Sequence, residues 1–241
     1  MPPFVFAGAF CVSLIGAVVQ SVCGFGYGPL NMSLLPYLMP YQQAVALAGL
    51  CGTTTAAMVA FSGWRHANWR KVWPATVTSI IVSGTFVWLS SFAADKLMLR
   101  LLGCVLIALG LYSLFLNGKI RIRPTVRNSV IAGAISGVTS GLFAVGGPPM
   151  ALYLIGATDN NDEYRSTLNA HFCVNSIMTT FMRWRNGVFT APVMHLYLLL
   201  LAALLIGAWI GTKIFHRLDQ NKLRKAVYGY LIISGLLLFL K

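Results

Sequence analysis

The stretch SVCGFGYGP, from Ser21 to Pro29, breaks an apolar run near the start of the chain with three glycines and a proline. A second stretch of the same kind, SGLFAVGGPP, runs from Ser140 to Pro149 and also follows an apolar run. Glycine adopts backbone angles that other residues resist, and proline suits the first turn of a new helix, where its missing N–H would have no partner. Each stretch therefore predicts the end of one helix, a turn and the start of another.

The composition around these stretches indicates a membrane protein. Of the 241 residues, 57% are hydrophobic and only 10% are charged, whereas a soluble domain carries about 25% charged residues. All five acids lie between apolar segments, and a soluble core could not absorb so much apolar surface. We therefore expect an all-α polytopic membrane protein, embedded in the lipid bilayer with about 8–10 membrane segments.

The net charge of +13 arises from 18 basic residues in short clusters between the apolar runs. Such clusters are typical of cytoplasmic loops at an anionic leaflet, so we do not expect nucleic-acid binding. The five cysteines lie in apolar runs, without a C-x-x-C pair or a histidine at ligand spacing. The sequence therefore predicts no metal site, no other cofactor and no disulfide framework.

Two of the apolar runs are too short to cross a bilayer. Residues 27–39 and 147–157 each follow one of the glycine-proline stretches, and a full span needs about 17–25 residues. Short segments interrupted by glycine and proline, at matching places in two halves of a chain, are typical of broken helices at a transport site. We therefore expect two half-length helices, one in each half.

The two halves of the chain carry an ordered series of matched residues. Gly28-Pro29 and Gly147-Pro148 are 119 positions apart, and Asp95 and Asp219 are 124 positions apart. An offset that drifts in one direction is what a few loop insertions produce after an internal duplication. The sequence therefore predicts three parts: a first transmembrane repeat over residues 1–117, a basic cytoplasmic linker over 118–128 and a second transmembrane repeat over 129–241.

The distribution of charge favours an inverted arrangement of these repeats. If the linker is cytoplasmic and each half crosses the membrane an odd number of times, 13 of the 18 basic residues face the cytoplasm. A parallel repeat would leave about 10 there, so the positive-inside rule predicts two inverted structural repeats. Among the few basic residues on the outside, Arg183 and Arg185 flank Trp184 and are predicted to form an interface anchor.

The two turns also predict a binding site for an anion. Non-helical backbone inside a membrane is tolerated only where protein or water surrounds it. The N-terminus of a half-helix presents free N–H groups and the positive end of the helix dipole. An inverted repeat brings both turns to one site, although the glycines could instead serve close helix packing. The candidate substrate-binding residues in and just before the turns are Gln20, Ser21, Gly24, Gly26, Gly28, Pro29, Thr139, Ser140, Gly141, Gly146, Gly147 and Pro148.

A later segment is unusually polar for a membrane span. Asn169, His171 and Asn175 lie two to six residues apart, and His171 and Asn175 fall on one helical face. They are candidates for substrate binding, with His171 also a candidate for proton coupling; the alternative is hydrogen bonding between helices. Arg165 opens this segment, either as a binding arginine for a sulfonate or carboxylate or as a residue that extends toward the lipid interface.

These motifs carry a resemblance to a known family. GFGYGP and GLFAVGGPPMALYLIG, in two related halves of a membrane protein of this length, resemble the sulfite exporter TauE/SafE family of membrane transporters. The resemblance spans the whole chain and implies a secondary transporter in the bacterial inner membrane. Members of that family move sulfite and organosulfonates such as sulfoacetate, so the resemblance implies a small sulfur-containing oxyanion as substrate. From the two turns and the membrane potential we expect export of this anion by alternating access.

Other functions remain as alternatives. The chain could form an anion channel, or it could import a different small organic anion. An intramembrane enzyme would need a concentrated catalytic set, which His171 without a nearby acid does not supply, so we expect no enzymatic activity. Glycine-rich spans would permit packing into a homodimer.

Overall fold

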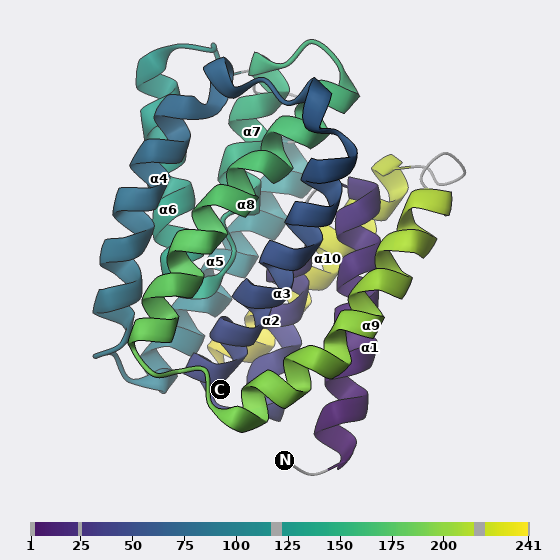
Figure 1. The fold of residues 1–241 in the computed structure, drawn as a ribbon. Helices are drawn as coiled ribbons and strands as arrows, with labels where there is room; N and C mark the ends of the chain where they lie inside the picture. Colours follow the sequence, from purple (N-terminus) through teal and green to yellow (C-terminus); the bar gives the residue numbers. More distant parts are fainter. Residues whose placement is uncertain (1–2, 24–25, 117–121, 215–219, 241) are drawn as a thin grey trace.

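The computed structural model describes residues 3–23, 26–116, 122–214 and 220–240. Within these ranges the chain folds into ten α-helices and one 3₁₀ turn, with no strand (Figure 1). The predicted all-α class is therefore confirmed. Residues 118–121 of the predicted linker lie outside the described residues.

Both halves of the chain contain the same order of helices: long, short, long, long and long. The first half holds α1 (Pro3–Cys23), α2 (Tyr27–Leu38), α3 (Tyr41–Ser62), α4 (Trp69–Ser90) and α5 (Asp95–Leu116). The second half holds α6 (Val126–Phe143), α7 (Gly147–Ala157), α8 (Asn161–Arg185), α9 (Ala191–Ile214) and α10 (Gln220–Phe239).

The short helices α2 and α7 contain 12 and 11 residues. At about 1.5 Å per residue they reach about 16–18 Å, roughly half of the hydrocarbon thickness of a bilayer. The predicted half-length helices are confirmed. In Figure 1, α2 lies in the half of the molecule nearer the two chain ends, and α7 lies in the opposite half.

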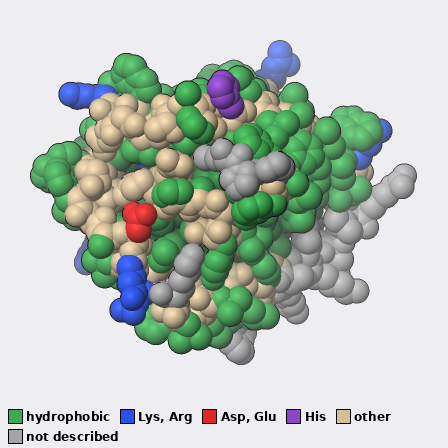
Figure 2. Space-filling view, turned by 90° about the horizontal axis from the view of Figure 1, so that it is seen from below, with side chains coloured by type: hydrophobic (Ala, Val, Ile, Leu, Met, Phe, Trp, Pro, Cys, Tyr) green, Lys and Arg blue, Asp and Glu red, His purple; other side chains and the backbone are tan. Residues whose placement is uncertain are grey.

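Four helices among the described residues are long and apolar enough to cross a membrane. They are α1 over Phe4–Val22, α3 over Tyr41–Phe61, α4 over Trp69–Ser90 and α9 over Ala191–Ile214. Large apolar side chains are also exposed on the outside of the bundle, among them Phe61, Ile81, Trp88, Leu198 and Trp209. Figure 2 shows hydrophobic side chains around the rim of one end of the molecule. These lengths and surfaces fit a multi-pass membrane protein.

Small residues let the helices pack closely. Helix α4 packs against α6, and α1 packs against α9. At Gly137 of α6, an added β-carbon would come within 2.9 Å of the carbonyl oxygen of Ser79 in α4, and at Gly207 of α9 it would come within 2.6 Å of the carbonyl oxygen of Leu14 in α1. Because lipid gives no hydrophobic drive for association, close backbone approach of this kind holds membrane helices together.

Candidate functional site

The two glycine-proline turns touch each other. A β-carbon at Gly28, in the first turn of α2, would overlap the carbonyl oxygen of Ala144, which lies between α6 and α7. Gly26 has a φ of 123°, and Ala144 has a φ of 55°. Glycine accepts such angles freely, whereas an L-residue such as alanine pays about 1 kcal/mol or more for the left-handed region.

The helices that leave the two turns present different numbers of backbone donors. In α2, the first hydrogen bond within the helix runs from Leu30 N–H to the carbonyl oxygen of Gly26. The N–H groups of Tyr27 and Gly28 therefore have no partner inside the helix, and Pro29 has no N–H group. In α7, Gly147 is followed by two prolines, so its first three positions hold one N–H. The α2 turn is therefore the richer source of donors.

A cavity of about 50 Å³ lies between these turns and the helices α3 and α8. Its wall combines backbone at the turns with hydroxyl and amide side chains, and none of the residues that line it is charged. The lining residues are Gln20, Gly26, Gly28, Pro29, Ala48, Gly49, Gly52, Ser140, Ala144, Gly146, Gly147, Phe172, Asn175, Ser176 and Thr179.

Half of the predicted site residues line this cavity, from both turns and from α8. They are Gln20, Gly26, Gly28, Pro29, Ser140, Gly146, Gly147 and Asn175. Gly24 lies outside the described residues. The cavity thus brings together predicted residues that are up to 155 positions apart in the chain.

Asn169 and His171 support the cavity from behind its wall. Gln20 Nε2 donates to Asn169 Oδ1 at 3.3 Å, which joins α1 to α8. His171 Nδ1 lies 2.9 Å from Thr76 Oγ1, and its Nε2 lies 3.5 Å from Ser136 Oγ. Ser136 in turn donates to the carbonyl oxygen of Gly146 at 2.8 Å. His171 is therefore placed to hold the second turn, and it does not line the cavity.

Asn175 connects the cavity to two neighbouring helices. Its Oδ1 accepts bonds of 3.0 Å from Ser79 and Ser83 of α4, and its Nδ2 donates to Ser140 Oγ of α6 at 2.8 Å. The residue is 2% exposed, so these bonds satisfy polar groups that could not reach water. Asn175 thus both lines the cavity and fixes α8 against α4 and α6.

The other predicted residues do not line the cavity. Ser21 packs against Gly211 of α9, and Gly141 packs against Ser83 of α4, so both serve close helix contact. The hydroxyl of Thr139 donates to carbonyl oxygens of its own helix. Pro148 is buried in the first turn of α7, and Arg165 lies one turn into α8 without lining the cavity.

Several lining residues were missed by the sequence analysis. Gly49 and Gly52 of α3 carry no side chain that could signal a site, although their three-residue spacing places them on one helical face. Thr179 lies four residues after Asn175 on the face of α8 that the sequence marks as polar, but it was not among the predicted binding residues. Phe172 and Ser176 carry no sequence signal that would separate them from ordinary packing residues.

Arg183 differs from its prediction as an interface anchor. It is 2% exposed, whereas its neighbour Trp184 is 65% exposed and Arg185 lies on the surface. Its Nη2 donates to the carbonyl oxygens of Gly141 at 2.7 Å and of Ser140 at 3.4 Å. The physical reason is helical phase: Arg183 follows Asn175 by eight residues and therefore shares the buried face of α8, and Arg185 does not.

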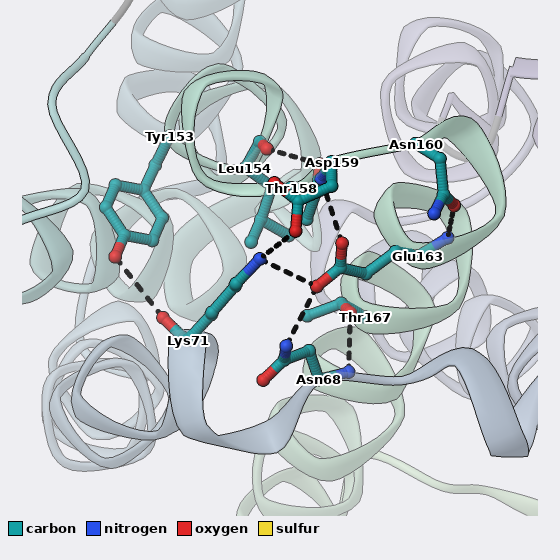
Figure 3. Close-up of polar contacts among 9 residues, drawn as sticks. All are labelled: Asn68, Lys71, Tyr153, Leu154, Thr158, Asp159, Asn160, Glu163 and Thr167. Carbon is teal, nitrogen blue, oxygen red and sulfur yellow. Dashed lines mark hydrogen bonds and ion pairs between the residues drawn. The ribbon is translucent and has the colours of Figure 1, made fainter.

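A cluster of polar residues closes the end of the bundle away from the chain ends (Figure 3). Lys71 Nζ at the start of α4 lies 2.9 Å from Asp159 Oδ2 and 3.0 Å from Glu163 Oε1. Asn68 Nδ2 donates to Glu163 Oε1 at 2.9 Å, and Asn68 N–H donates to Thr167 Oγ1 at 2.9 Å. This group, which we call the Lys71 cluster, ties α4 to α8 and to the α7–α8 connection.

The Lys71 cluster also sets the charge state of Glu163, in the first turn of α8. Burial alone would raise the pKa of this carboxyl group, but the backbone N–H of Asp159 and the side chains of Lys71 and Asn68 outweigh it. The pKa of Glu163 therefore lies below its usual value. The lowered pKa keeps Glu163 ionised at neutral pH, where it can pair with Lys71.

The sequence as a whole matches one family of known proteins. The family model described as "Sulfite exporter TauE/SafE" matches residues 9–238. The chain is 28% identical over 232 residues to the "Probable sulfite/organosulfonate exporter TauE" of Cupriavidus necator, a match that covers 93% of this chain and 90% of that protein. No solved structure matches the chain significantly.

Proposed function

The chain belongs to the sulfite exporter TauE/SafE family, and on this premise we propose that it exports a small sulfur-containing oxyanion across the bacterial inner membrane. It is a multi-pass membrane transporter rather than an enzyme. The observation that carries the proposal is the polar cavity between the two turns. The relative from Cupriavidus necator, whose name refers to sulfite and organosulfonates, supports the choice of substrate class.

The lining of the cavity suits an oxyanion. Helix α2 points its N-terminus at the cavity, and a helix N-terminus favours negative charge through its free N–H groups and its dipole. Ser140, Asn175 and Ser176 add hydroxyl and amide groups around it. No acid lines the cavity to repel an anion.

The size of the cavity favours sulfite over an organosulfonate. A single water needs about 10–15 Å³ of such space, so a cavity of about 50 Å³ suits a small ligand better than a long one. Sulfite has four non-hydrogen atoms, whereas sulfoacetate has eight and would require the turns to move apart. We therefore propose sulfite as the preferred substrate of this conformation.

Inverted halves would explain why both turns meet at one cavity. The order of helices repeats, so that α1 corresponds to α6 and α4 to α9. The contact of α4 with α6 therefore corresponds to the contact of α9 with α1, and both are present. The opposite placement of α2 and α7 in Figure 1 supports the inversion. In this arrangement the end that carries the Lys71 cluster faces the cytoplasm. The basic residues Arg65, Arg70 and Lys71 at this end agree with that orientation.

Alternating access would require the Lys71 cluster to open and close. Its bonds join α4 to α8 at the proposed cytoplasmic end, and we propose that they break when that end admits an anion. A membrane potential that is negative inside favours export of an anion by about 2.3 kcal/mol per charge per 100 mV. Export therefore needs no acidic relay within the spans.

Thermal unfolding of the purified, detergent-solubilised protein tests this function. We expect sulfite to raise the unfolding temperature, since a ligand at 100 times its Kd adds about 2.7 kcal/mol to stability. Thiosulfate, sulfate, sulfoacetate, taurine, phosphate and acetate form the comparison panel, and we expect the larger sulfoacetate to stabilise less than sulfite. Stabilisation by phosphate or acetate, with none by any sulfur oxyanion, would contradict the assignment.

A further inference from the structure

A buried arginine lies at the edge of the cavity. Arg183 follows the lining residue Thr179 by four residues on α8, and it is 2% exposed. A β-carbon at Gly49, another lining residue, would lie 3.5 Å from Arg183 Nη1 and 3.9 Å from the β-carbon of Ala144. Nη1 therefore lies close to the cavity, and the absence of a side chain at Gly49 leaves the space between them open.

The guanidinium group of Arg183 has only part of its hydrogen bonding satisfied. Nη2 donates to the carbonyl oxygens of Gly141 and Ser140, which belong to the C-terminal end of α6. No described residue accepts a hydrogen bond from Nε or Nη1, although both atoms are buried. Unpaired buried donors of a charged group are rare in proteins because they cost several kcal/mol.

The charge of Arg183 is also incompletely balanced. Both ion pairs found among the described residues involve Lys71, at the other end of the bundle. The C-terminal end of α6 offers about half of a negative charge, and the hydroxyl of Tyr41 already donates to the carbonyl oxygen of Leu142 there. A buried cation without a full counter-charge is costly, so this environment leaves room for an anionic partner.

The cavity supplies a place for that anion. Its lining residues offer dipoles but no charge, whereas guanidinium binds oxyanions through charge-assisted hydrogen bonds. Building on the proposed function, we propose that Arg183 is the specificity-determining charge of the site, and that its Nη1 pairs with the sulfur oxyanion held between the two turns. Arg183 thereby selects anions over neutral solutes of the same size.

Substitutions of Arg183 test this role by the Kd for sulfite, measured by titration of the purified protein. We expect Arg183→Gln to raise this Kd at least tenfold, which is about 1.4 kcal/mol, and Arg183→Lys to recover part of the loss. Tyr41→Phe removes the other side chain that bonds to the end of α6 and leaves the charge in place, so it should bind sulfite with nearly unchanged Kd. An Arg183→Gln protein that binds sulfite as tightly as the wild type would overturn the proposal.

A second pair of variants decides the question if Arg183→Gln does not fold. Gly49→Ala places a methyl group between Nη1 and the cavity at ordinary contact distance, so the fold should tolerate it. Gly52→Ala adds the same group to the same helix and cavity, 3.7 Å from Tyr27 and away from Arg183. We expect the Kd for sulfite to rise at least threefold in Gly49→Ala and clearly less in Gly52→Ala.

The outcomes separate this inference from the proposed function. Equal losses in Gly49→Ala and Gly52→Ala would show that cavity volume matters and not Arg183, which would overturn the inference and leave the function standing. A wild-type protein that binds no sulfur oxyanion at all would instead refute the proposed function itself.

Discussion

Replacement of Gly28 by alanine should push the two turns apart. The added β-carbon would overlap the carbonyl oxygen of Ala144 and lie 3.6 Å from the Cα of Val145. Both are backbone atoms, which cannot turn aside as a flexible side chain can, so one turn must move by on the order of 1 Å. Overpacking of this kind costs about 1–3 kcal/mol.

The same movement should impair transport far more than folding. In enzymes, a misplacement of about 1 Å costs about 100-fold in rate, and we expect Gly28→Ala to lose sulfite transport in reconstituted vesicles to a similar extent. Gly229→Ala is the matched control, because a β-carbon at Gly229 in α10 meets nothing within 4 Å; it should keep transport and gain about 0.5–1 kcal/mol of stability. A folded Gly28→Ala protein with wild-type transport would refute the contact between the turns as the basis of the site.

Three further substitutions probe other parts of the account. Ala144→Gly relieves the left-handed backbone at φ 55° and should raise the free energy of unfolding by about 1 kcal/mol; an unchanged or lower value in denaturant unfolding would argue against this strain. Asn175→Asp keeps acceptors for Ser79 and Ser83 but puts a negative charge at the cavity wall, so the Kd for sulfite should rise at least tenfold (about 1.4 kcal/mol), and an unchanged Kd would place the anion elsewhere. Glu163→Gln should lower the unfolding temperature at neutral pH; because the pKa of Glu163 is lowered, the difference from wild type should persist at neutral pH and shrink only as the pH falls below the usual range of a glutamate. A difference that does not depend on pH would show that the charge of Glu163 does not hold the Lys71 cluster.

The half-length helices could be predicted closely from sequence because their signals are local. The predicted segment 147–157 coincides with α7 (Gly147–Ala157), and the segment 27–39 ends one residue beyond α2 (Tyr27–Leu38). Glycine and proline determine where a membrane helix breaks through their own backbone geometry, without reference to neighbouring helices. The eight predicted residues that line the cavity come from these turns or from the polar face of α8.

The rest of the site depends on which helix faces which, and this information is not local. Gly49 lines the cavity because α3 packs against α8. Arg183 was predicted at the interface because arginine beside tryptophan is common there, but one face of α8 is buried along its full length and includes Arg183. Gly141, predicted as part of the anion site, instead lets α6 approach α4. Identical glycines thus serve turns in one place and helix contact in another, and only the packing distinguishes them.

The Lys71 cluster shows a further limit of sequence reasoning. Lys71 and Glu163 are 92 positions apart, and in the sequence each stands in a polar stretch between apolar runs that resembles any solvated loop. Their ion pair at 3.0 Å follows from the packing of α4 against α8. A cytoplasmic gate at this place is therefore a hypothesis that arises from the structure and not from a motif.

Counterflow of radiolabelled sulfite in reconstituted vesicles tests the central claim most directly. Vesicles that contain the wild-type protein and are preloaded with unlabelled sulfite should transiently accumulate the label above its outside concentration, because a carrier exchanges one bound anion for another through a single site. Preloading with taurine should give no such accumulation. Equilibration of the label without any overshoot would indicate a channel, and no uptake at all would contradict a sulfite site between the two turns.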